Sequence, residues 1–223
     1  MASTIGEIEM PLYVGLDVSQ ATTAVCVVDQ QGGRHWRGVC ATEPSAIASM
    51  VRRRAGGDAK VGVETGSMTP WLVHGLRSAG LDVVCLDARR VKAALQMRLN
   101  KTDQNDAEGL AQVVRTGWYR AVHVKSLDSH RARSLLGARA QLVGMRTRLI
   151  NMIRGVLKTF GMLPGSGRGQ KFDRHVEALL QGEPQVAMIA RPLLDVLRQL
   201  GEQITTFDKA VQRRSEPILP VAP

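Results

Sequence analysis

Short apolar segments separated by turn residues make up the chain as far as about residue 87. The first three, at residues 12–19, 22–29 and 34–40, alternate loosely between apolar and polar positions, and a Gln-Gln-Gly-Gly turn precedes the third. This pattern predicts an antiparallel meander. Two further strand-like segments lie at residues 59–66 and 81–87. The region therefore reads as five short strands.

Helix-like stretches at residues 43–57 and 69–80 end at glycine and would connect the last three strands. The resulting order, β-β-β-α-β-α-β, predicts a mixed sheet whose first three strands are antiparallel and whose other strands are joined by right-handed crossovers. This is the ribonuclease H-like topology, an α/β fold, in which the first and fourth strands are neighbours. We expect this domain to cover residues 10–120.

Beyond about residue 118 the pattern changes to that of long helices. One set of apolar residues recurs at spacings of seven, four and three and marks one helix face: Leu135, Leu142, Leu149, Ile153, Val156 and Phe160. After a glycine-rich loop, a second set alternates spacings of four and three, as a coiled-coil seam does: Leu193, Leu197, Leu200, Ile204, Phe207 and Val211. We expect residues 121–223 to be an α-helical coiled-coil region that forms a hairpin or a dimer interface.

The charge balance indicates the kind of binding partner. The net charge is +10, which favours a polyanion, either nucleic acid or an acidic membrane surface. Between residues 131 and 172 there are nine Lys or Arg and no Asp or Glu. We expect this basic helix to follow a nucleic-acid backbone, the alternative being a solvated helix face. The contacts would be Arg139, Arg146, Arg148, Arg154 and Lys158.

Cysteine usage and hydropathy indicate the cellular compartment of the protein. Cys26, Cys40 and Cys85 are odd in number, lack a CxxC spacing and fall in strand-like segments, so we interpret them as reduced core residues. No apolar run approaches the ~20 residues of a membrane helix, and the first residues do not have the pattern of a secretion signal. We expect a cytoplasmic protein that does not enter the membrane.

Two acidic residues stand out on the predicted strands. If residues 12–19 are extended, Gly15 and Asp17 share one face, and Gly62 and Glu64 share a face in the same way on the fourth strand. Because the first and fourth strands are expected to be neighbours, both acids would project from the central part of the sheet, and the glycines would leave room for something bulky. A lone acid at a strand end is more often solvated or capping.

Asp103 and Asp106 lie three residues apart at the start of a helix-like stretch, so they share a helix face. Either could instead act at the helix N-terminus, as a cap or by favouring the dipole. Four carboxylates facing one another repel unless divalent cations neutralise them. We therefore predict that Asp17, Glu64, Asp103 and Asp106 hold Mg²⁺, with two ions in the manner of two-metal phosphodiester chemistry and Mn²⁺ as a substitute.

Several motifs resemble one known family. These are "GLDVS", "VETG", "PWLVHGLRSAGLDVVCLDARRV", "KTDQNDAEGLAQ" and "LVGMRTRLINMIRGVLKTFG", in that order along the chain. They resemble the DEDD transposases of insertion sequences, the IS110 group, which are relatives of the Piv and MooV DNA invertases. The most specific match is "KTDQNDAEGLAQ". In this resemblance the acidic tetrad of the family falls on the same four residues reached above. Lys101, in the same motif as Asp103 and Asp106, is expected to contact nucleic acid.

The resemblance implies a RuvC-like metal-dependent domain, a helical linker that dimerises or tetramerises, and a further domain with a nucleophilic serine. Ser19, Ser67 and Ser166 do not lie in a matching context, so we expect a chain truncated before that domain. The implied function is DNA cleavage and strand transfer at the element ends and target, with a structured RNA of the element as a further partner. The alternatives are a RuvC-like structure-specific nuclease and a catalytically inert DNA-binding fragment.

Overall fold

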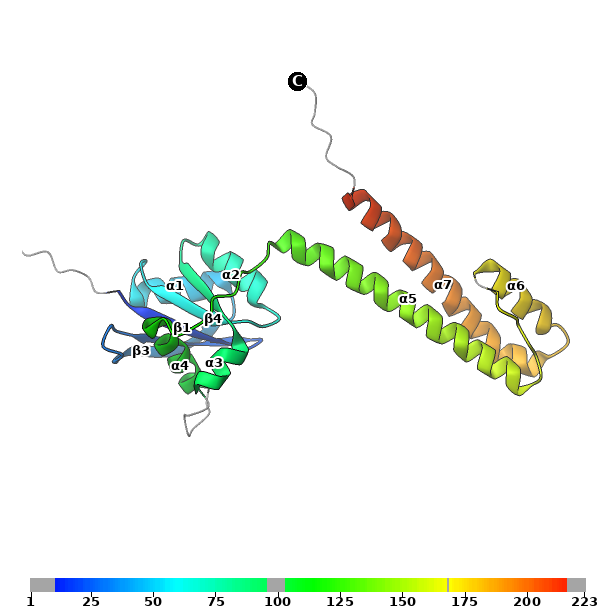
Figure 1. Cartoon of the computed structure of the whole chain (residues 1–223), viewed down its shortest axis with the longest axis horizontal. Helices are drawn as coiled ribbons and strands as arrows, with labels where there is room; N and C mark the ends of the chain where they lie inside the picture. The colour runs from blue at the N-terminus through cyan, green and yellow to red at the C-terminus, as the bar shows by residue number, and fades with distance from the viewer. Residues whose placement is uncertain (1–10, 96–102, 168, 216–223) are drawn as a thin grey trace, which may run out of the picture. The chain divides into compact units, whose positions relative to one another are not determined.

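The structure, a computed structural model, describes residues 11–95, 103–167 and 169–215. It divides into two compact units, Met1–Leu127 and Asp128–Pro223, each of which is described by itself (Figure 1). The elements of the first unit follow the predicted order and are β1 (Tyr13–Val18), β2 (Thr22–Val28), β3 (Arg34–Ala41), α1 (Pro44–Ala55), β4 (Lys60–Glu64), α2 (Thr69–Ser78), β5 (Asp82–Leu86), α3 (Ala88–Leu95) and α4 (Asp103–Thr116).

The five strands form one mixed sheet in the order β3-β2-β1-β4-β5. β1 pairs with β2, and β2 with β3, in antiparallel fashion, whereas β1 pairs with β4, and β4 with β5, in parallel. This is the α/β, ribonuclease H-like sheet with flanking helices that the sequence predicts. The expected adjacency of the first and fourth strands is confirmed.

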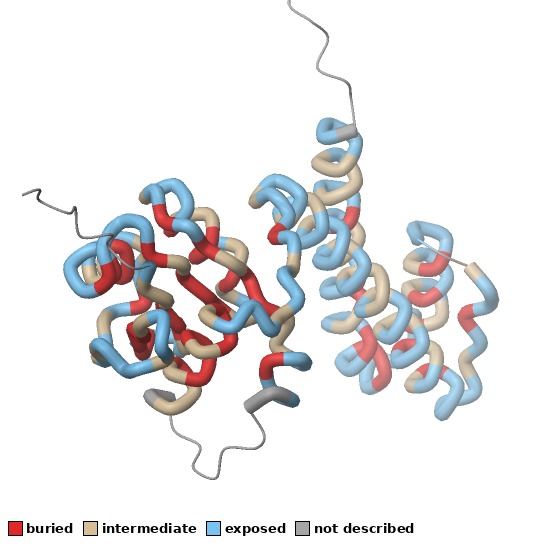
Figure 2. The backbone as a smooth tube through the Cα atoms, turned by 60° about the vertical axis from the view of Figure 1, so that its left-hand side comes forward, coloured by how far each residue is buried: buried red, intermediate tan, exposed pale blue. Residues whose placement is uncertain are grey.

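Helices cover both faces of the sheet. Val14 and Leu16 of β1 are fully buried and belong to a core cluster with Ile47 of α1 and Leu72 of α2. Tyr13, on the alternate side of β1, packs with residues of α4 instead. The predicted alternation along β1 is therefore confirmed, with α1 and α2 on one face and α3 and α4 on the other. Figure 2 shows the buried residues concentrated on the strands and on the inner sides of the helices.

Two glycines allow α4 to lie directly on the sheet. A Cβ added to Gly15 would come 2.0 Å from the carbonyl oxygen of Ala107, and one added to Gly62 would come 2.2 Å from Cγ2 of Val114. No larger side chain fits at Gly15 without moving the backbone of α4. The room that the sequence predicts beside Asp17 and Glu64 is thus occupied by α4 itself.

The described part of the second unit contains three helices: α5 (Leu127–Thr159), α6 (Gln170–Leu179) and α7 (Pro184–Ser215). Its apolar core joins Ile153 and Leu157 of α5, Phe172 of α6, and Leu194 and Leu197 of α7. At the other end of the long helices, Arg214 of α7 pairs with Asp128 of α5. The two long helices therefore run antiparallel, which is the hairpin arrangement among the two expected.

The burial pattern of these helices departs from the predicted seams in two places. Phe160, placed on the apolar face of the first long helix, follows the last residue of α5 and remains 52% exposed. On α7, Leu194 is fully buried whereas Leu193 of the predicted seam is only half-buried. The difference arises because α7 must contact both α5 and α6, so its buried stripe is displaced from a simple two-helix seam. The sequence interpretation also missed α3 and α6.

Candidate functional site

The carboxyl ends of β1 and β4 meet at a pocket of about 400 Å³. Leu16 pairs with Val63 across the two parallel strands, so Asp17 and Glu64 each come one residue later at adjacent positions. Both acids are half-buried, and both line the pocket. The full lining is Leu16, Asp17, Val18, Ser19, Gln20, Val63, Glu64, Thr65, Gly66, Ser67, Met68, Thr69 and Leu72.

The loop after each strand is fixed by backbone hydrogen bonds. After β1, the Ser19 N–H donates to the Thr22 carbonyl at 3.0 Å and closes the turn into β2. After β4, the Thr65 N–H donates to the Leu86 carbonyl at 2.9 Å, and the Thr65 hydroxyl accepts from the Ala88 N–H at 3.2 Å. The pocket is therefore built from segments that the sheet and α3 hold in place.

The orientation of α4 bears on the other two predicted acids. At its C-terminal end, Gln112 donates to the Gly32 carbonyl at 2.7 Å and Arg115 donates to the Gln30 carbonyl at 3.1 Å, so this end lies at the β2–β3 turn. That turn is at the end of the sheet where Tyr13 pairs with Val28, the end opposite Asp17. The N-terminal end of α4 is therefore directed toward the carboxyl end of β1.

Asp103 is the first residue of α4, but its side chain lies outside the described part of the structure. Asp106 is half-buried and directly precedes Ala107, whose carbonyl oxygen abuts Gly15. It is not among the residues that line the pocket. The structure thus brings Asp17 and Glu64 together in one pocket and leaves Asp106 beside it on α4.

The donor chemistry of the pocket suits a hard divalent cation. Two carboxylates, the hydroxyls of Ser19 and Thr65, and backbone carbonyls provide oxygen ligands, which Mg²⁺ and Mn²⁺ prefer. Within the residues that the structure describes, no three His, Cys, Asp or Glu side chains gather into a metal-binding group. The pocket itself therefore supplies two carboxylates, and further ligands from the start of α4 remain a prediction.

The predicted nucleic-acid contacts on α5 differ in what they already touch. Arg139 forms an ion pair with Asp208 of α7. Arg154 donates to the Gly167 carbonyl at 3.2 Å, and its guanidinium lies 5.3 Å from the centre of the Phe172 ring. Both side chains therefore contribute to the packing of the second unit, which a count of basic residues along the sequence does not reveal.

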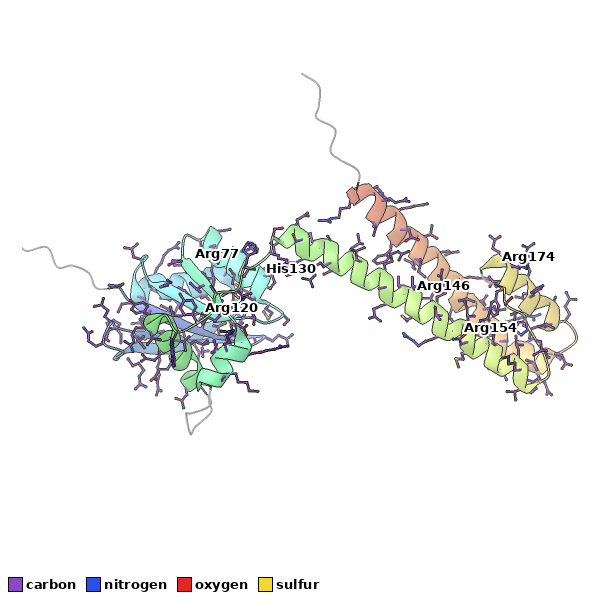
Figure 3. The ribbon with its side chains drawn as sticks, in the orientation of Figure 1. Arg77, Arg120, His130, Arg146, Arg154 and Arg174 are labelled. Atoms are coloured by element: carbon purple, nitrogen blue, oxygen red, sulfur yellow. The ribbon has the colours of Figure 1, made fainter. Side chains whose placement is uncertain are left out.

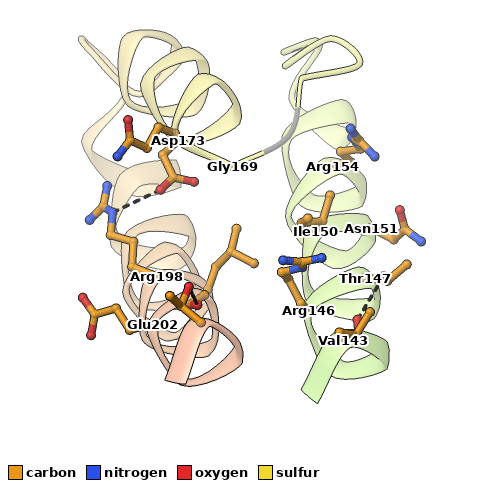
Figure 4. Close-up of a pocket in the computed structure, with 14 residues that line it drawn as sticks. Val143, Arg146, Thr147, Ile150, Asn151, Arg154, Gly169, Asp173, Arg198 and Glu202 are labelled. Carbon is orange, nitrogen blue, oxygen red and sulfur yellow. Dashed lines mark hydrogen bonds and ion pairs between the residues drawn. The ribbon is translucent and has the colours of Figure 1, made fainter. Parts of the chain in front are cut away.

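Arg148 and Lys158 are exposed on α5, and Arg146 is half-buried. Figure 3 shows Arg146 and Arg154 on α5. In Figure 4, Arg146 projects from α5 into a cleft of about 960 Å³ that α5, α6 and α7 line together, where Asp173 and Arg198 form an ion pair at 3.5 Å. Lys101, predicted as a contact, lies outside the described residues. Arg148 and Lys158 are thus the predicted contacts whose charge is most open to solvent.

The cysteines have the character of core thiols. Cys26 and Cys85 are buried and Cys40 is half-buried, and all three are thiols rather than members of a disulfide. Burial raises the pKa of the Cys85 thiol, an effect that Arg77 opposes, and burial also raises the pKa of Cys40. Raised pKa values keep the Cys40 and Cys85 thiols protonated, which makes these two side chains poor nucleophiles and poor metal ligands.

The sequence interpretation of the site overlooked the buried threonines next to it. Thr23, Thr42 and Thr69 are buried, and Thr69 lines the pocket with Asp17 and Glu64. The available signal was weak: a threonine follows Glu64 by five residues and begins α2, directly before Pro70. A threonine at the start of a helix is ordinarily interpreted as a cap, and only the folded structure shows its contact with the preceding strand.

Comparison with known proteins adds a family to this geometry. Residues 14–162 match a family model, DEDD IS110, that is described as a transposase. The chain is 27% identical over 212 residues to the transposase for insertion sequence element IS1111A of Coxiella burnetii, covering 94% of this chain and 55% of that protein. It is 27% identical over 206 residues to a family 20 transposase of Pseudomonas aeruginosa, covering 92% of this chain and 58% of that protein.

A third similar protein, the transposase y4pF/y4sB of Sinorhizobium fredii, is 31% identical over 124 residues, which cover 52% of this chain and 31% of that protein. The chain therefore spans a little over half the length of the first two relatives.

None of the described helices is both long enough and apolar enough to cross a membrane.

Proposed function

The chain belongs to the DEDD transposase family of the IS110 group, and on that premise we propose that its first unit holds divalent cations for phosphodiester chemistry on DNA. The proposed ligands are Asp17 and Glu64, completed by Asp103 and Asp106 from the start of α4. The observation that carries the proposal is the convergence of Asp17 and Glu64 on one pocket at the ends of two parallel neighbouring strands.

The placement of the two carboxylates explains why cations are needed. Asp17 and Glu64 extend from adjacent positions of two paired strands, and α4 packs directly on Gly15 of the first strand. Two half-buried carboxylates so placed repel each other, and a bound cation relieves that repulsion. Bound Mg²⁺, or a pair of such ions, would activate an attacking oxygen and stabilise the leaving oxygen of a phosphodiester.

The second unit would hold the nucleic acid rather than react with it. We propose that Arg148 and Lys158 contact the phosphate backbone, because they are exposed and lie in a helix segment without acidic residues. Such contacts position a nucleic acid without reading its sequence. DNA of the element ends is the proposed substrate.

The proposal is tested by titrating the purified chain with MnCl₂ and measuring free Mn²⁺ by electron paramagnetic resonance. Glu64→Gln and Asp17→Asn should each weaken binding by about a hundredfold or more, since each removes a charged ligand. Glu43→Gln is the matched control, because Glu43 is an exposed residue before α1 whose side chain is not among those that line the pocket. Equal Mn²⁺ affinity in Glu64→Gln and Glu43→Gln would refute the proposed metal centre.

A cleavage assay extends the test to chemistry. The chain is incubated with Mg²⁺ and a labelled duplex that carries an element end, and broken strands are resolved on a denaturing gel. Cleavage that requires Mg²⁺ and is lost in Glu64→Gln, but not in Glu43→Gln, is the expected result. Cleavage that survives in Glu64→Gln would assign the reaction to other residues.

A further inference from the structure

The buried polar side chains of the described residues are Thr23, Thr42 and Thr69, and their hydrogen bonds lie at the loops that follow β1 and β4, the strands that carry Asp17 and Glu64. Building on the proposed metal centre, we propose that these threonines are positioning residues: Thr69 sets the direction of Glu64, and the Thr23–Thr42 pair sets the turn that follows Asp17. None of them would touch the metal or the DNA.

On the β4 side, one hydroxyl fixes the backbone on both sides of the loop. The Thr69 Oγ1 donates to the carbonyl of Glu64 at 2.8 Å and accepts from the N–H of Gly66 at 2.7 Å. The Thr69 N–H also donates to the Gly66 carbonyl at 3.3 Å. Thr69 is only 7% exposed, so solvent cannot easily replace these bonds. The peptide that leaves Glu64 is therefore held in one orientation, and with it the direction of the Glu64 side chain.

On the β1 side, two hydroxyls form a short relay. The Thr42 Oγ1 donates to the carbonyl of Ser19 at 2.9 Å, and the Thr23 and Thr42 hydroxyls lie 2.8 Å apart. Because the single hydrogen of Thr42 is given to Ser19, Thr23 must donate to Thr42. The Thr42 N–H also donates to the Ala21 carbonyl at 3.0 Å. The relay ties the turn after Asp17 to the end of β3.

Their location argues for a role beyond general stability. Burying a hydroxyl is unfavourable unless it is hydrogen-bonded, so cores use apolar residues where only packing matters. The buried clusters elsewhere in the described chain, including the core of the second unit, are made of apolar side chains. Among the residues that the structure describes, the buried hydroxyls all lie at the ends of β1 and β4, beside Asp17 and Glu64. In other proteins, outer partners orient metal ligands from comparable positions.

The test compares Thr69→Val with Thr69→Ser by the MnCl₂ titration. Valine keeps the shape but removes both hydroxyl bonds, so the Mn²⁺ dissociation constant should rise about tenfold. Serine keeps the hydroxyl and should restore the affinity to within about threefold of the starting chain, which a purely steric role would not require. Thr42→Val and Thr42→Ser form a second pair with the same expected order and a smaller effect.

Thr116→Val is the matched control, because the Thr116 hydroxyl also donates to backbone carbonyls, those of Gln112 and Val113, and lies at the far end of α4. It should leave the Mn²⁺ affinity unchanged. All titrations are made at least about 15 °C below the melting temperature of each variant, where the native state dominates, so that a change in affinity reflects the folded site. If Thr69→Val does not fold, the Thr42 pair decides the question.

The outcomes separate this inference from the metal centre on which it rests. Tight Mn²⁺ binding by the starting chain with loss in both valine variants supports both proposals. Unchanged affinity in folded Thr69→Val and Thr42→Val would overturn the positioning role while leaving the metal centre in place. A starting chain that does not bind Mn²⁺ would overturn both.

Discussion

The two units use polar residues in opposite ways. In the first, hydroxyls are buried beneath one pocket, and acidic residues converge at strand ends that the backbone fixes. In the second, the core is apolar and the charges lie outside it, where Arg139 pairs with Asp208 and Arg198 pairs with Asp173 and Glu177. The first unit is thus built to hold a few groups in a defined geometry, whereas the second is built as a helical frame with an excess of positive charge.

The difference teaches that charge along a sequence is not a direct measure of ligand contact. Some arginines of a basic helix form contacts within the protein instead, as Arg139 does with Asp208 and Arg154 does with Phe172. Asp17 and Glu64, in contrast, lie at the ends of adjacent strands and line one pocket.

The largest expected effect concerns the close packing of the first unit. Gly15→Ala places a Cβ against the backbone of α4 and should lower the free energy of unfolding by about 3 kcal/mol. Gly137→Ala is the control in α5, where nothing lies within 4 Å of the added Cβ, and it should raise stability by about 0.5–1 kcal/mol through helix propensity. Urea denaturation followed by circular dichroism measures both, and equal destabilisation would break the contrast.

A smaller effect separates the structural and the exposed arginines of α5. Arg148→Ala should reduce the salt dependence of DNA binding by about one unit of the log–log slope, because one phosphate contact is lost. Arg139→Ala should leave that slope nearly unchanged and lower the stability of the second unit by about 0.5 kcal/mol, since its pair with Asp208 is largely exposed. Fluorescence anisotropy with a labelled duplex between about 50 and 200 mM NaCl distinguishes the two.

If both arginine variants reduce the slope equally, Arg139 leaves Asp208 to bind DNA and the internal pair is not a fixed feature. If neither changes it, the proposed contact face of α5 is wrong. Lys158→Ala serves as an independent check, because Lys158 is exposed like Arg148 and should behave like it.

The smallest effect is a pH dependence at Cys85. Burial raises the pKa of this thiol above its ordinary value of 9.0, so the folded chain keeps a proton that the unfolded chain loses as the pH rises past 9.0. Stability is therefore fully present below that pH and declines above it. Cys85→Ala should show a shallower decline between about pH 8.5 and 10 in thermal melts, and an identical decline in both proteins would exclude Cys85 as the cause.

Much of the first unit could be predicted from local pattern. The alternation of Val14 and Leu16 with Gly15 and Asp17 identified the two faces of β1, and the order of elements gave the neighbouring position of β4. These features depend only on the period of a strand and on the handedness of crossovers. The same reasoning led to the carboxylate pair, because adjacent parallel strands end at the same edge of a sheet.

The rest depended on contacts between distant segments. The sequence suggested free space beside Gly15, yet Ala107, far along the chain, fills it. The seam on α7 was displaced from Leu193 to Leu194 because α6 packs against the same helix. The role of Thr69 was hidden for the same reason, since a hydroxyl shows its partner only when a strand end and a helix start are brought together.

The most direct test of the central claim is the position of a bound metal. Crystals of the chain grown with MnCl₂ would be measured near the manganese absorption edge to give an anomalous difference map. We predict a peak in the pocket between β1 and β4, bonded to carboxylate oxygens of both Asp17 and Glu64. A map with a peak at other residues, or with no peak in that pocket at a saturating Mn²⁺ concentration, would contradict the account.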